Sequence, residues 1–201
     1  MGRSSQFLFV FVFMILYVVM GTLLHESGHI LIAKVLGYHS ILHYGSMNWY
    51  PPDGAEGTDP AHSFYITLGG VVLLDVISLV ALGVLVFKGK QLSQWLFWLL
   101  VFLAMLIYRH IVLSVICLGL IIIDGRPIAY GSDEKEIAHY LSVSNSVVGI
   151  PLLIVAFVSC YVLFFVVFGK EYRYRFLIAG GIGGIIGYTG WLYFIGPLVM
   201  P

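Results

Sequence analysis

The part of the chain best suited to chemistry places two histidines and a glutamate within five residues, in His25-Glu26-Ser27-Gly28-His29. On a helix, residues four apart are separated by about 40° around the axis and about 6 Å along it, so both imidazoles can bind one zinc ion. The glutamate between them can take a proton from a zinc-bound water. The motif predicts one Zn²⁺ per chain, with His25 and His29 as ligands and Glu26 as the catalytic base. The alternative is a chance match whose side chains bond to neighbouring helices.

A catalytic zinc site needs a third protein ligand, since it normally has three and leaves the fourth position to water. Asp124 precedes Gly125 at the end of an apolar run, where it is also typical of a turn. Asp133 opens a polar stretch, where it is also typical of a helix cap. The full set of candidates is Asp75, Asp124, Asp133, His43, His62 and His110.

Apolar residues dominate the chain that must position these groups. Of its 201 residues, 60% are hydrophobic and 10% are charged, with ten basic and ten acidic side chains. Soluble domains carry about 25% charged residues, so the composition excludes a soluble globule. The zero net charge gives no electrostatic footprint for nucleic acid. Cys117 and Cys160 both lie in apolar runs, which indicates neither a disulfide framework nor a thiolate metal site. The sequence therefore predicts a multi-pass protein of the lipid bilayer.

Five apolar runs are long enough to cross the hydrocarbon core, which takes about 20 residues of helix. Because backbone groups in lipid must pair internally, we expect these runs to be helices of one all-α polytopic domain over residues 1–201. The loop from Gly37 to His62 is rich in strand-forming residues, so we expect a short strand or hairpin there. Such an edge could hold substrate as an added strand, or the loop could be an interfacial segment anchored by Trp49 and Tyr50. The five runs are Phe7–Leu36, Phe64–Phe87, Trp95–Ile123, Val147–Phe168 and Phe176–Val199.

The third run carries Tyr108, Arg109 and His110 near its centre. It could bend around a polar pocket, but we expect one long tilted helix; a break at Arg109 would reverse the topology of everything after it. Buried charges in lipid usually pair with one another. Asp75, midway along the second run, is therefore the expected ion-pair partner of Arg109.

Two further patterns concern packing and orientation. Gly180/Gly184 and Gly183/Gly187 have the spacing of close helix packing, and no strand precedes them as a nucleotide loop would need. Lys and Arg residues are concentrated in loops on the side of the amino terminus, which the positive-inside rule predicts to be cytoplasmic. These basic residues are Arg3, Lys88, Lys90, Lys170, Arg173 and Arg175.

The motif and its surroundings resemble the site-two protease family of intramembrane zinc metalloproteases. Besides His-Glu-x-x-His, the chain has Gly69-Gly70 near the start of the next run, where the family often has a Gly-Gly or Gly-Pro pair, and a later aspartate. The resemblance covers most of the chain in order, although only the first motif is specific. It implies that Glu26 is the general base, that His25 and His29 bind zinc, and that an aspartate from a later segment is the third ligand.

Two aspartates compete for that third position under the resemblance. Ile123-Asp124-Gly125 is similar to the Leu-Asp-Gly of many members, but the Asn-Pro stretch that precedes it there is missing. A compact, poorly characterised branch is similar around Ser132-Asp133-Glu134. The pattern that follows there is matched by Ile137, Ala138, Leu141, Gly149 and Pro151. The resemblance therefore favours Asp133 over Asp124.

We expect an intramembrane zinc endopeptidase that hydrolyses peptide bonds in transmembrane or membrane-proximal segments of a protein or peptide substrate. A membrane metal-binding or scaffold protein without proteolytic activity is the alternative. A membrane di-iron oxygenase is a less favoured alternative: His25/His29 and His39/His43 form the His-x-x-x-His pairs used by that class, but the adjacent histidine pairs that it also uses are missing.

Overall fold

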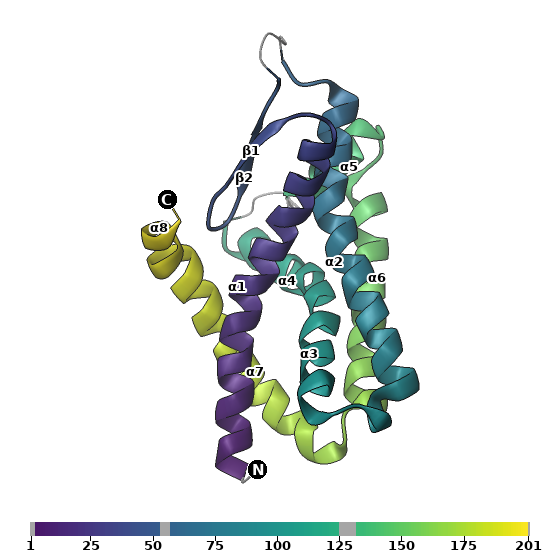
Figure 1. Ribbon diagram of the computed structural model, residues 1–201, viewed down its shortest axis with the longest axis vertical. Coiled ribbons are helices and arrows are strands. Elements are labelled where there is room, and N and C mark those ends of the chain that lie inside the picture. The colour runs from purple at the N-terminus through teal and green to yellow at the C-terminus, as the bar shows by residue number, and fades with distance from the viewer. Residues whose placement is uncertain (1–2, 53–56, 125–131, 201) are drawn as a thin grey trace.

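The computed structural model describes residues 3–52, 57–124 and 132–200, which are mostly helical (Figure 1). Within these ranges there are eight α-helices: α1 (Arg3–Val35), α2 (Pro60–Lys88), α3 (Gln94–Ala104), α4 (Arg109–Asp124), α5 (Ser132–Tyr140), α6 (Asn145–Val162), α7 (Lys170–Gly190) and α8 (Gly196–Val199). Short 3₁₀ segments are η1 (Gly89–Gln91) and η2 (Leu106–Tyr108), and π-helical turns are η3 (Leu163–Val167) and η4 (Trp191–Ile195). The strands are β1 (His39–Leu42) and β2 (Met47–Tyr50).

Five helical segments are long and apolar enough to cross a membrane, which confirms the predicted all-α polytopic fold. Large apolar side chains face outward along them; Phe87 and Leu198, for example, are each 85% exposed. An apolar surface of this extent is stable in lipid and not in water, so the chain is a multi-pass membrane protein. The segments are Phe7–Val35, Pro60–Gln91, Gln94–Val115, Asn145–Val167 and Lys170–Val199.

The predicted hairpin is present directly after α1. Gly37 adopts a φ of +84°, which lets Tyr38 donate its N–H to the carbonyl of Ala33 and turns the chain out of the helix. Strands β1 and β2 then pair antiparallel, with Leu42 opposite Met47. In Figure 1 the hairpin lies at the end of the bundle where α1 ends and α2 begins.

The third apolar run is not one continuous helix, so the prediction of a single long helix is wrong. Helix α3 ends at Ala104, and α4 leaves in a new direction after η2 (Figure 1). Side chains from two other spans bind the backbone groups that the break releases. The Ser78 hydroxyl donates to the carbonyl of Ala104 at 2.6 Å and accepts from the N–H of Ile107 at 3.3 Å. The Tyr17 hydroxyl donates to the carbonyl of Met105 at 2.9 Å. The bend is stable at membrane depth because these hydroxyls replace helix hydrogen bonds.

The break does not reverse the topology. Figure 1 shows α3 beginning at one end of the bundle, and α5 and the start of α6 at the opposite end, where α2 begins. The predicted alternation of the five spans is therefore retained.

Helix α7 crosses α1 at very short range through two of the predicted glycines. A Cβ on Gly183 would lie 2.5 Å from the carbonyl oxygen of Phe11, and one on Gly187 would lie 2.9 Å from the Cα of Ile15. Only glycine permits backbones to approach this closely. A Cβ on Gly180 or Gly184 would lie at ordinary contact distance from the side chain of Met14, so the close packing depends chiefly on the second pair.

Ser78→Ala tests the account of the bend. The substitution leaves the Ala104 carbonyl and the Ile107 N–H buried without their hydroxyl partner, which costs about 1–3 kcal/mol for such groups. We expect a lower unfolding temperature of the purified protein in detergent. The matched control is Ser114→Ala, because the Ser114 hydroxyl donates to the carbonyl of His110 within its own helix. Equal stability of the two variants would contradict the role given to Ser78.

Candidate metal centre

Glycines bring α1 and α2 into direct contact at the His-Glu-x-x-His motif. A Cβ on Gly28 would lie 2.6 Å from the carbonyl oxygen of Gly69, and a Cβ on Gly70 would overlap the ring of His29. The missing side chains therefore make room for the His29 imidazole between the two helices. This contact gives a physical role to the Gly69-Gly70 pair.

The two histidine rings are held in different ways. His29 donates from Nδ1 to the carbonyl oxygen of Ile66 at 2.8 Å, which fixes its tautomer and leaves the lone pair of Nε2 free to bind a metal. Nδ1 of His25 is buried without a hydrogen-bond partner among the described residues. The orientation of the His25 ring therefore depends on what its Nε2 contacts.

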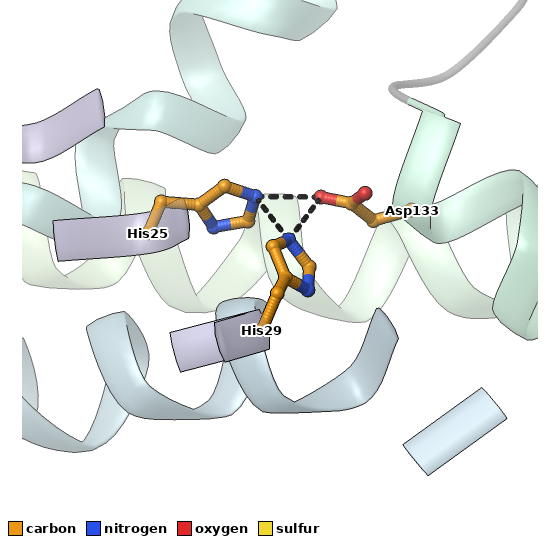
Figure 2. A group of neighbouring side chains, drawn as sticks. All are labelled: His25, His29 and Asp133. Carbon is orange, nitrogen blue, oxygen red and sulfur yellow. Dashed lines mark hydrogen bonds and ion pairs between the residues drawn. The ribbon is translucent and has the colours of Figure 1, made fainter. Parts of the chain in front are cut away.

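Asp133, in the first turn of α5, meets both rings (Figure 2). Its Oδ2 lies 2.8 Å from Nε2 of His25 and 3.8 Å from Nε2 of His29, and the two Nε2 atoms are 3.0 Å apart. All three residues are buried, with exposed fractions of 9% or less. They point at one centre although 104 residues or more separate Asp133 from the histidines. This group could hold a metal ion.

The donor set fits a small divalent metal. In tetrahedral zinc coordination, bonds of 2.0–2.1 Å place the ligand atoms about 3.3 Å apart. The three separations here, between 2.8 and 3.8 Å, lie on both sides of that value. Two imidazole nitrogens and one carboxylate oxygen are also a ligand set found in catalytic zinc sites.

The surroundings of Asp133 favour the ionised carboxylate, which is the form that binds a metal. Burial raises its pKa, but the hydrogen bond with His25 and the positive charge of Arg109 outweigh burial and hold the pKa of Asp133 well below its usual value. The guanidinium of Arg109 lies 3.3 Å from Oδ2.

The expected pairing of Arg109 with Asp75 is therefore wrong, because His110, the residue after Arg109, contacts Asp75 instead. Asp75 contacts Nε2 of His110 at 3.0 Å, while Arg109 faces Asp133. Consecutive helical residues point about 100° apart, so the two basic residues at the start of α4 reach different acids.

Glu26 lies beside the three candidate ligands and is not one of the group. It is 8% exposed and lies between the two histidines on α1. Its carboxylate is close enough to His29, Asp133 and Arg109 for electrostatic interaction. This is the neighbourhood expected of a proton acceptor at the site.

The other candidate ligands lie elsewhere or outside the described part of the chain. His43 contacts the side chain of Asn48, and His62 contacts the hydroxyl of Tyr38. Asp124 ends α4, and its side chain falls outside the described residues. Within the ranges that the structure describes, the metal cluster contains only His25, His29 and Asp133. His39 and His43, the second pair considered for a di-iron site, belong to the hairpin and not to this cluster.

Sequence reasoning missed a second buried group beside the metal cluster. Nδ1 of His110 lies 3.3 Å from Oε1 of Glu134, so this ring bridges Glu134 and Asp75. The sequence does contain a signal for this contact: two adjacent basic residues, Arg109 and His110, in the third run, and two adjacent acidic residues at Asp133-Glu134. Comparison of the chain with protein-family models, curated proteins and solved structures finds no match, so the resemblance to site-two proteases rests on the sequence motifs alone.

Proposed function

We propose that the protein is an intramembrane zinc metallopeptidase that hydrolyses peptide bonds in transmembrane or membrane-proximal segments. One observation carries the proposal: both histidines of the motif and the distant Asp133 converge on one centre, with Glu26 buried beside them. A glutamate and two histidines inside a lipid-spanning helix are costly unless they serve a function.

The residues have separable roles in this hydrolysis. His25, His29 and Asp133 hold the ion. A bound zinc ion supplies Lewis acidity that polarises the peptide carbonyl and makes a water molecule acidic near neutral pH. Glu26 takes a proton from the attacking water as the new C–O bond forms, and then gives that proton to the amine nitrogen as the C–N bond breaks.

The position of the centre suggests where the substrate lies. The histidines occupy the second half of α1, and α5 with the hairpin lies at that end of the bundle (Figure 1). A substrate segment unwound there could pair with a hairpin edge as an added strand. With the amino terminus cytoplasmic, as the loop charges favour, the centre lies nearer the opposite membrane surface.

Metal content and cleavage together test the proposal. The purified protein in liposomes should contain one zinc per chain and should cut some members of a set of transmembrane peptides, with the products detected by mass spectrometry. Chelation should abolish cleavage and added Zn²⁺ should restore it. Two irons per chain would favour an oxygenase. One zinc with no product from any peptide would favour a metal-binding or scaffold protein.

A further inference from the structure

The ring of His110 connects three helices and is not one of the candidate metal ligands. Its Nε2 lies 3.0 Å from Oδ1 of Asp75 on α2, and its Nδ1 lies 3.3 Å from Oε1 of Glu134 on α5. The three side chains are at least 84% buried. A doubly protonated imidazole can donate to both carboxylates at once. Such charge-assisted hydrogen bonds are among the stronger ones available in a buried site.

Helix α5 carries Asp133. Helix α2 also contacts α5 on a face other than the one that carries Glu134. The Thr67 hydroxyl donates to Oε2 of Glu136 at 2.7 Å, and the rings of Phe64 and Tyr140 stack with centroids 4.4 Å apart. Glu136 and Tyr140 are four residues apart, so they share one face of α5. Contacts along a single face fix where the helix lies, but they fix its rotation about its own axis less firmly.

Glu134 supplies a contact on another side of α5 that opposes this rotation. At 100° per residue, it projects about 160° away from Glu136 around α5 and about 100° from Asp133. Its bond to His110 therefore holds the helix from the side opposite the Thr67 contact. A rotation of α5 would move the Asp133 carboxylate away from the two histidine rings.

We propose that His110 is a positioning residue, which bridges Asp75 and Glu134 and so sets the rotation of α5 that aims Asp133 at the metal. The proposal rests on the metal centre of the proposed function, but not on peptidase activity. Groups that orient a metal ligand without touching the metal typically contribute 10- to 100-fold to metal affinity. An effect of about that size is expected when the bridge is removed.

The test is the affinity of the full-length protein for Zn²⁺, measured in detergent by competition with a chelating dye. His110→Gln should weaken Zn²⁺ binding by about 10- to 100-fold. His139→Gln is the matched control, because His139 is exposed on α5, and it should bind Zn²⁺ like the original chain. The absorption spectrum of bound Co²⁺ should change in His110→Gln and not in His139→Gln, because it reports the ligand geometry.

If His110→Gln does not fold, Glu134→Gln decides the question, since its amide keeps the volume of the side chain and loses the charge that His110 contacts. Unchanged Zn²⁺ affinity and an unchanged Co²⁺ spectrum in the folded variant would overturn the proposal, as would equal losses in the His139→Gln control. These outcomes are separate from failure of the proposed function, in which the original chain binds zinc and cleaves nothing.

Discussion

Glu26→Gln should abolish peptide cleavage while the protein keeps its zinc. The amide has nearly the same size as the carboxylate, so the packing of this buried residue is retained. It cannot accept a proton from water, and general base catalysis typically contributes about 10²- to 10⁴-fold to rate. We therefore expect a loss of at least that order in the rate of product formation. Product is measured by mass spectrometry and zinc by elemental analysis of the same preparation.

The control for this result is Glu171→Gln, which makes the same chemical change at an exposed position in the first turn of α7. It should cleave at the original rate. Cleavage by a pure Glu26→Gln preparation at the rate of the Glu171→Gln control would overturn the assignment of the base. Loss of zinc from Glu26→Gln would instead assign the carboxylate to metal binding.

Asp133→Ala should lose the metal, and Asp124→Ala should retain it. The first substitution removes one of three converging ligand atoms, so we expect Zn²⁺ affinity to fall by roughly 100-fold or more, beyond the 10- to 100-fold effect of groups that only orient a ligand. It also removes the carboxylate that faces the partly exposed Arg109, and the loss of this ion-pair partner should lower stability as well. Asp133→Asn, which keeps the volume, separates lost coordination from lost folding.

Chelator competition on all three variants gives the answer, with the unfolding temperature as a check on the fold. The reverse pattern, in which Asp124→Ala loses zinc and Asp133→Ala keeps it, would make Asp124 the third ligand.

The spans and the hairpin could be predicted from sequence because each depends on local properties. A run of about 20 apolar residues must be helical in lipid whatever surrounds it. The break in the third run could not be predicted in this way. It depends on Ser78 and Tyr17, which lie in other spans and look in sequence like ordinary small or aromatic residues of a helix.

The site shows the same division between local and distant information. The spacing of His25 and His29 on one helix predicts that they share a face, and the structure places both at the centre. The choice of Asp133 depended on resemblance, because spacing along a chain does not define contact across more than a hundred residues. Arg109 was predicted as the partner of Asp75, but the partner is His110, the next residue. The 3₁₀ turn before them changes the direction in which each later side chain points around the helix axis.

The hydroxyl of Ser78 also indicates when the candidate metal centre can form during assembly of the protein. A third span newly inserted in lipid has no outside partner for the groups around Met105, so it is most stable as an uninterrupted helix. The bend can form only once α2 has docked and Ser78 reaches those groups. Arg109 and His110 then turn toward the acids of α2 and α5. We therefore expect any metal loading of this centre to follow membrane insertion and helix docking.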